Sequence, residues 1–193
     1  MDKQNLKNYF IKTLSMSDSK ANELTLKYNY REFKKNDFLL EIKKISNEIF
    51  FIDQGMVRTF TFDIDGNEIT TNIYSPPCFA SDFLSFFKRE PSQENVQALT
   101  NCKVWFLTYE QVQENFHSIP EFREFGRMLL INNYASLKTR MLGMIQLTAE
   151  QRYESLLKQN PEIFKHLQLK HIATYLGITD TSLSRIRKDA AKK

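Results

Sequence analysis

The residues best suited to chemistry lie near the end of the chain, in the stretch LKHIATYLGITDTSLSRIRK, Leu169 to Lys188. Its second half brings together hydroxyl groups, carboxylate, guanidinium groups and an ammonium group. Such side chains bind base edges and phosphate oxygens, and a guanidinium can donate to both O6 and N7 of guanine. The candidate DNA contacts are Thr179, Asp180, Thr181, Ser184, Arg185, Arg187 and Lys188.

The apolar residues around Gly177 predict two short helices that would position these side chains. Before the glycine they recur at helical spacing, at Leu169, Ile172, Ala173 and Leu176. Gly177 suits a tight corner with positive φ, and Thr179 is expected to cap the second helix. That helix turns Leu183 and Ile186 inward, so the order predicts a helix-turn-helix that can enter the major groove of DNA. Many helical hairpins share this spacing, which alone leaves DNA binding open.

Positive charge is concentrated in the same region. The chain carries a net charge of +4, and residues 165–193 hold seven Lys or Arg and two Asp. The rest of the chain is therefore close to neutral, which favours a polyanionic partner contacted by the C-terminal end. A solvated basic terminus would explain the same charge, so both interpretations stay open.

A different pattern precedes this region. Residues of about 30–108 are rich in Phe, Ile, Val and Thr in short alternations, which predicts antiparallel strands in a closed or sandwiched roll. Val57–Phe62 and Glu68–Tyr74 are the expected strands of a hairpin, with Asp65-Gly66 in its turn. Helical character is expected near Asp82–Phe87. The predicted fold class is α+β, an N-terminal antiparallel β roll followed by helices.

Helical periodicity resumes after about Tyr109, and Pro120 fits the start of a long helix that runs to about Gln146. Apolar residues cover more than one face of this helix, so it must bury two sides. One side can lie on the roll, and the other is expected to pack on the same helix of a second subunit. A single core helix in a monomer is the alternative. A further helix is predicted over Ala149–Gln159, stopped by Asn160-Pro161.

Composition excludes several classes of protein. No apolar run is long enough to span a membrane, and the N-terminus lacks the apolar core of a signal peptide. Cys78 and Cys102 are expected to be reduced and buried, which predicts a cytoplasmic protein. The roll contains no histidine, so a cupin-type metal enzyme is not expected, and no catalytic, metal or cofactor site is predicted. His117, His166 and His171 are expected on the surface or as caps, rather than as haem ligands.

These segments, in this order, resemble the Crp/Fnr superfamily of bacterial transcription regulators. NEIFFIDQGMVRTFTFDIDGNEIT is similar to the family's roll strands, the helix from Pro120 resembles its dimerisation helix, and HIATYLGITDTSLSRIRK is similar to its helix-turn-helix signature. The resemblance implies a cyclic-nucleotide-binding-like jelly roll joined to a winged-helix-type DNA-binding domain in a homodimer. It divides the chain into a roll with N-terminal helices (1–118), a dimerisation helix (119–147) and a helix-turn-helix domain (148–193).

The resemblance also locates a ligand pocket, which departs from the pattern of the cyclic-nucleotide binders. In those proteins a Gly-Glu pair and an Arg-Ser or Arg-Thr pair hold the ribose and the phosphate. At the matching positions stand Ser81, Asp82, Ser92 and Gln93. Because a buried phosphate would lack its counter-charge, cyclic AMP is not expected to bind tightly. Three alternatives stay open: the pocket is empty, it is filled by Phe83, Phe86 and Phe87, or it takes another effector.

The resemblance therefore implies a sequence-specific transcriptional regulator whose partners are double-stranded DNA, read as an imperfect palindrome, and a second copy of the chain. An unidentified small-molecule effector and RNA polymerase are further candidate partners. Asp180, Thr181 and Arg185 match base-reading positions, and Asp180 departs from the basic residue common in the best-known members. The alternative function is a ligand-sensing or protein-interaction module that does not bind DNA.

Overall fold

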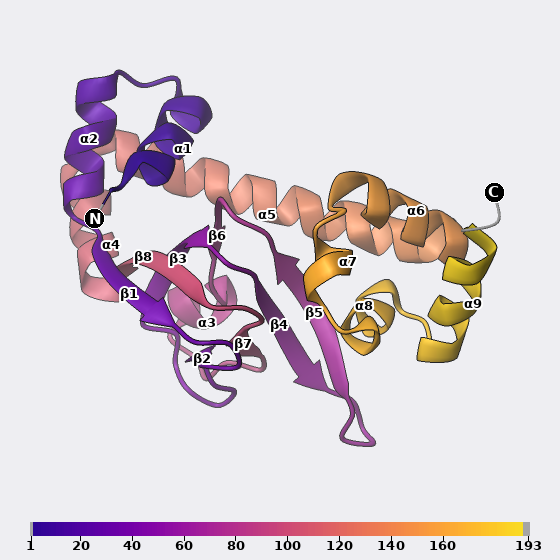
Figure 1. Cartoon of the computed structure of the whole chain (residues 1–193). Coiled ribbons are helices and arrows are strands. Elements are labelled where there is room, and N and C mark those ends of the chain that lie inside the picture. The colour runs from indigo at the N-terminus through magenta and orange to yellow at the C-terminus, as the bar shows by residue number, and fades with distance from the viewer. Residues whose placement is uncertain (1, 191–193) are drawn as a thin grey trace.

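The computed structural model describes residues 2–190, which form a strand-rich centre with helices at both ends (Figure 1). The helices are α1 (Gln4–Leu14), α2 (Asp18–Leu26), α3 (Phe83–Lys88), α4 (Tyr109–Ser118), α5 (Pro120–Gln146), α6 (Ala149–Gln159), α7 (Ile163–His166), α8 (Leu169–Leu176) and α9 (Asp180–Ala190). The strands are β1 (Asn29–Phe33), β2 (Phe38–Leu40), β3 (Glu48–Gln54), β4 (Val57–Phe62), β5 (Glu68–Tyr74), β6 (Cys78–Ala80), β7 (Asn95–Ala98) and β8 (Cys102–Thr108). The predicted α+β class is confirmed. Over the described residues, no helix is both long and apolar enough to cross a membrane.

The strands form two antiparallel sheets, with the orders β1-β8-β3-β6 and β2-β7-β4-β5. Side chains alternate between the two faces of the first sheet. Phe51 lies opposite Trp105 and packs in the core between this sheet and the helices, called here the outer core. Phe50 lies opposite Phe106 and packs in the core of the roll itself. The sheets do not close into a barrel, so the sandwiched form of the two predicted rolls is the one observed.

The predicted hairpin is confirmed with the expected strand limits, β4 and β5. In its turn, Asp63 Oδ1 accepts hydrogen bonds from the backbone N–H groups of Asp65 and Asn67 at 2.9 and 2.8 Å, and Gly66 has a φ of +82°. Strand β5 ends its sheet, because β4 pairs with it on one side and no strand among the described residues pairs with it on the other. Its outer edge is therefore free to contact another element.

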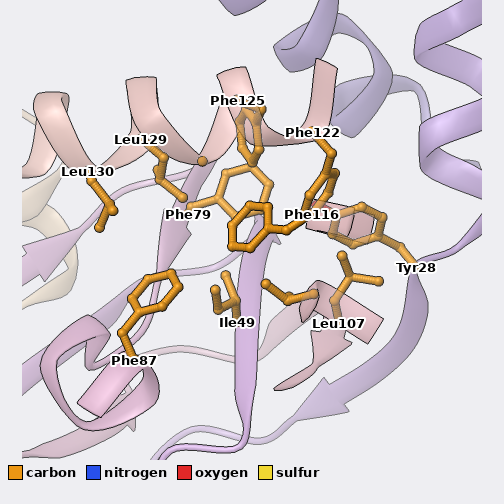
Figure 2. A pocket seen from close by; sticks show the side chains of 12 residues that line it. Tyr28, Ile49, Phe79, Phe87, Leu107, Phe116, Phe122, Phe125, Leu129 and Leu130 are labelled. Atoms are coloured by element: carbon orange, nitrogen blue, oxygen red, sulfur yellow. The ribbon is translucent and has the colours of Figure 1, made fainter. Parts of the chain in front are cut away.

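Aromatic side chains hold the first half of α5 on the roll. Phe122, Phe125 and Leu129 are buried. The ring of Phe125 packs on Phe79 of strand β6, with ring centres 4.9 Å apart, and that of Phe122 packs on Phe116 of α4 (Figure 2). Gly126 allows α4 to approach α5, since a Cβ atom at this position would lie 2.6 Å from the ring of Phe116. This packing fixes the direction in which α5 leaves the roll, toward the C-terminal helices (Figure 1).

Helices α6–α9, called here the helix-turn-helix unit, lie beside the second half of α5 (Figure 1). The described residues after β8 include no strand, so this unit is helical throughout. Its core cluster continues into the roll, where Met56 and Leu99 are buried with it. His171 of α8 lies at this contact and is 8% exposed, which corrects the expectation that it is a surface or capping residue. The reason is that the roll covers a second face of α8. The spacing of apolar residues within α8 does not predict this contact.

Candidate nucleic-acid interface and effector cleft

The corner between α8 and α9 is built as the sequence predicts. Gly177 adopts a φ of +67°, in the left-handed region, directly after α8. The backbone N–H of Ile178 donates to the carbonyl oxygen of Ala173 at 3.0 Å, which closes the end of that helix. Thr179 Oγ1 accepts a hydrogen bond from the backbone N–H of Ser182 at 3.2 Å, so the predicted cap of α9 is confirmed.

Helix α9 is anchored along one side and exposed along the other. Leu183 is fully buried, as are Ile172 and Ala173 of α8 in the same core cluster. The seven candidate DNA contacts are all exposed: Thr179, Asp180, Thr181, Ser184, Arg185, Arg187 and Lys188. Within residues 2–190 the three cations of α9 form no ion pair. The face therefore offers unneutralised positive charge beside short polar groups.

The second half of α5 carries an uncovered apolar face. Leu130, Tyr134, Leu137 and Met141 are 42%, 67%, 64% and 45% exposed. They recur at spacings of four, three and four residues, and Met144 continues the series. This is the heptad spacing of a two-stranded coiled coil, in which such positions face a partner helix. These five residues are called the α5 seam below.

Hydrogen bonds within the chain close the matched ligand-pocket positions. Ser81 is buried and donates to the carbonyl oxygen of Glu48 at 3.0 Å. Ser92 is also buried, and its hydroxyl donates to Asp82 Oδ2 at 2.6 Å. Gln93, in contrast, is exposed. The place that the resemblance gives to a phosphate is thus occupied by a serine–carboxylate pair.

The phenylalanines expected to fill the pocket divide between two places. Phe83 lines an open cleft between the roll and α5. Phe86 is fully buried in the core under the helices, and Phe87 lines a small apolar cavity there, so these two do not fill the matched pocket (Figure 2). The short α3 helix turns them away because its buried side faces this aromatic core.

The cleft between the roll and α5 has a volume of about 730 Å³, and Glu94 and Arg140 are its charged lining residues. Its helical wall includes three residues of the α5 seam, Leu130, Tyr134 and Leu137. Burial raises the pKa of the Glu94 carboxyl, and the Asp82 carboxylate adds to that shift. Both effects favour the protonated, neutral form of the Glu94 carboxyl, which lies in this cleft near the matched positions.

Two residues of this cleft are absent from the sequence-based site. Glu94 follows Ser92 by two positions, and this closeness in sequence to a matched position was the signal that could have placed it in the site. Arg140 lies on α5 between seam residues and has no pattern that separates it from an ordinary charge on an exposed helix. Burial lowers the pKa of its guanidinium, which stays charged near neutral pH.

Neither cysteine has the character of a reactive or metal-binding thiol. Both are free; Cys102 is buried as expected, whereas Cys78 is half-buried. Burial raises the pKa of Cys78 to about 12 and that of Cys102 to about 11, so both are protonated near neutral pH. Among the described residues, no three His, Cys, Asp or Glu side chains gather in a group that could hold a metal ion.

Comparison with known proteins agrees with this architecture. Residues 30–118 match the model of the cyclic nucleotide-binding domain. The chain is 23% identical over 167 residues to the transcriptional activator protein anr of Pseudomonas aeruginosa, an alignment that covers 81% of this chain and 68% of that protein. The solved structure of CLP, described as a c-di-GMP responsive global regulator of Xanthomonas campestris, superposes with a TM-score of 0.71 at 13% identity over 91% of this chain and 92% of that one. FixK2 from Bradyrhizobium japonicum gives a TM-score of 0.70 at 15% identity over 86% of this chain and 85% of that one.

The fold and the site define a class of protein in which a cyclic-nucleotide-binding-like roll is joined by a long helix to a helix-turn-helix. With the matches above, the chain is similar to proteins of the Crp/Fnr type, and its residues 30–118 match the cyclic nucleotide-binding domain.

Proposed function

We propose that the chain is a homodimeric, sequence-specific DNA-binding regulator of transcription that acts in the cytoplasm. The observation that carries this proposal is the exposed polar and cationic face of α9, held outward by the fully buried Leu183. A helix of this kind fits the major groove of B-DNA. The Pseudomonas aeruginosa relative, a transcriptional activator by name, supports the regulatory role.

Within α9, different residues are proposed for different parts of the duplex. Asp180 and Thr181 lie in the first turn, which reaches base edges in helix-turn-helix proteins. Arg185 is the proposed guanine reader, because its guanidinium can bond O6 and N7 together. Arg187 and Lys188 end the exposed face and are placed to neutralise phosphates.

The α5 seam is proposed to pair with the same seam of a second copy of this chain. Its spacing fits a parallel pair of helices, and leaving side chains as large as Tyr134 and Leu137 mostly in water is costly. Pairing along a twofold axis would place two α9 helices about 34 Å apart, in successive major grooves of an imperfect palindrome. The second copy would also lie over the mouth of the cleft, since Leu130, Tyr134 and Leu137 belong to both.

The cleft is proposed to take a small-molecule effector other than cyclic AMP. Asp82 and Ser92 bond to each other at the phosphate position, and Glu94 lines the same cleft. An anionic phosphodiester there would meet the Asp82 carboxyl group in place of the arginine of the cyclic-nucleotide binders, while Arg140 of the cleft lining is engaged by the carbonyl oxygens of Thr71 and Tyr175.

A gel-shift titration tests the proposal. The duplex is first selected from a random-sequence pool by the purified protein, and its affinity is then measured across a salt series for the parent and for Arg185→Ala. The parent should bind with a steep salt dependence, and the variant should lose about 1–3 kcal/mol and relax its choice at one base pair. Lys12→Ala, an exposed cation of α1, serves as the matched control and should bind like the parent. If no duplex is selected and the parent ignores DNA at low salt, the chain is instead a sensing or protein-interaction module.

A further inference from the structure

A hollow of about 260 Å³ lies where the second half of α5 meets α6 and the end of α8. Figure 1 shows α6 beside this part of α5. None of the residues predicted for DNA or for the ligand pocket lines it. An apolar cavity of about 150 Å³ can hold a benzene ring, so this hollow has room for a small organic molecule with a polar group. We call it the helix-junction hollow.

The charged residues that line the helix-junction hollow are both cationic. They are Arg140 of α5 and Arg152 of α6, and the lining contains no Asp or Glu. Among the described residues, neither guanidinium forms an ion pair. Glu94, whose charge acts on Arg140, lines the cleft on the roll rather than this hollow. The hollow is therefore electropositive, and an anion is the ligand that it favours.

Backbone carbonyl groups hold both guanidiniums in place. Arg152 donates from Nε to the carbonyl oxygen of Leu176 at 3.0 Å and from Nη1 to that of Leu147 at 2.6 Å. Arg140 donates to one carbonyl oxygen on β5 and one on α8, and its guanidinium lies 4.4 Å from the centre of the Tyr175 ring. A guanidinium has five N–H donors, and Nη2 of Arg152 bonds to no acceptor among the described residues. Donors for an anion are thus already ordered, which lowers the entropic cost of binding.

The remaining lining is suited to an apolar body. Leu156 of α6 and Leu176 of α8 are 7% and 3% exposed, and Met144 and Leu147 of α5 lie beside them in the lining. Gly143 leaves space on the α5 side, because an added Cβ atom would meet only Leu147 within 4 Å, at 3.7 Å. An apolar surface with a few fixed polar groups is the usual composition of a small-molecule site.

We propose that the helix-junction hollow binds a small monocarboxylate with an apolar body, whose carboxylate pairs with Arg152 and Arg140. The planar fork of a guanidinium matches the two oxygens of a carboxylate. An apolar body would displace water from Leu156 and Leu176, which an inorganic anion cannot do. The inference goes beyond the proposed function and does not depend on DNA binding.

The first test compares three probes that share one body, hexanoate, hexanamide and hexylamine, and adds inorganic phosphate. Binding is followed in the full chain by the amide NMR signals of Gly143 and Ser155, both in the lining. Hexanoate should shift these signals saturably and bind at least about tenfold more tightly than hexanamide, because it adds hydrogen bonds to a charged group. Hexylamine should not bind. The proposal is overturned if hexanamide binds as tightly, if phosphate alone binds, or if hexanoate shifts Glu94 of the cleft instead.

Variants then locate the binding site. Arg152→Gln should weaken hexanoate binding at least about tenfold. Arg123→Gln is the matched control and should bind like the parent, because the exposed Arg123 also donates to two carbonyl oxygens, at the other end of α5.

Gly143→Leu tests the hollow with both arginines in place. Leucine favours a helix over glycine, so this variant should melt no lower than the parent, and its side chain should fill the space and abolish hexanoate binding. It keeps the test decisive if Arg152→Gln does not fold. Parental affinity for hexanoate in folded Gly143→Leu, or in folded Arg152→Gln, would refute the site.

Discussion

Gly177→Ala places a Cβ atom on a backbone whose φ is +67°, a conformation that costs a residue with a side chain about 1–2 kcal/mol. The added carbon would lie 3.2 Å from Met144 Sδ, and that flexible side chain can move by the few tenths of an ångström required. The backbone term therefore dominates. For a chain of this size, the expected loss lowers the melting temperature by roughly 2–8 °C.

Two other glycines provide matched controls for this change. Gly66 has a φ of +82° and no atom within 4 Å of an added Cβ, so Gly66→Ala tests the backbone cost alone, far from α9. Gly143 lies inside α5, where an added Cβ comes within 3.7 Å of Leu147 Cδ1, an ordinary contact. Gly143→Ala should stabilise the chain by about 0.5–1 kcal/mol, because alanine favours the helix.

Urea unfolding and a gel shift with a selected duplex give the two readouts. Gly177→Ala should lower both the free energy of unfolding and the affinity for DNA, because the corner aims α9. Gly66→Ala should lower stability and leave the affinity unchanged. The account of the corner is refuted if Gly177→Ala is as stable as the parent, or if Gly143→Ala loses as much stability as Gly177→Ala.

Further expectations concern the seam, the interface with the roll, the cleft and the duplex. Leu137→Glu should convert the dimer to a monomer in sedimentation velocity, because it places like charges in the seam. Asn132→Lys, on the opposite face of α5, should stay dimeric. A dimeric Leu137→Glu variant would contradict the pairing of two α5 seams. Burial, and then the Arg58 guanidinium, lower the pKa of His171 from 6.5 to about 4, so its neutral form stabilises the fold fully above pH 6.5. This contribution to stability falls by about 1.4 kcal/mol for each pH unit between 6.5 and 4. The difference in melting temperature between the parent and His171→Gln should therefore shrink as the pH is lowered through this range. A difference that stays constant with pH would contradict this role of His171. Calorimetry with cyclic AMP should give no micromolar binding, and a saturating heat would contradict the proposal that the Asp82–Ser92 pair takes the place of a phosphate-binding arginine. Lys188→Ala should weaken binding to all duplexes alike and reduce the salt slope by about one, and a change in base preference would oppose that role.

Local patterns in the sequence were sufficient for the elements that carry the proposed DNA contacts. The limits of α5 and α6 follow from Pro120 and from Asn160-Pro161, because proline fits the start of a helix and halts one that precedes it. The corner at Gly177 follows from glycine's tolerance of positive φ. The hairpin follows from the nearly ideal alternation of Val57–Phe62 and from the Asp65-Gly66 turn that comes after it. Each of these features is decided within a few residues.

Features that depend on distant segments could not be predicted in this way. Arg58 and His171 are separated by more than a hundred positions, and no pattern around either residue predicts their contact. The cleft likewise joins Glu94 of the roll to Arg140 of α5, and its charge depends on burial that no sequence window contains. The exposure of Gln93 and the turning of Phe87 into the outer core result from the orientation of a six-residue helix and the loop that follows it.

Hydroxyl-radical footprinting of the parent protein on its selected duplex tests the central claim most directly. Two α9 helices held by paired α5 seams should protect two patches related by a twofold axis, with centres one helical turn, about 10 base pairs, apart. Arg185→Ala should weaken both patches equally. A single patch without symmetry, or no protection at low salt, would contradict the account.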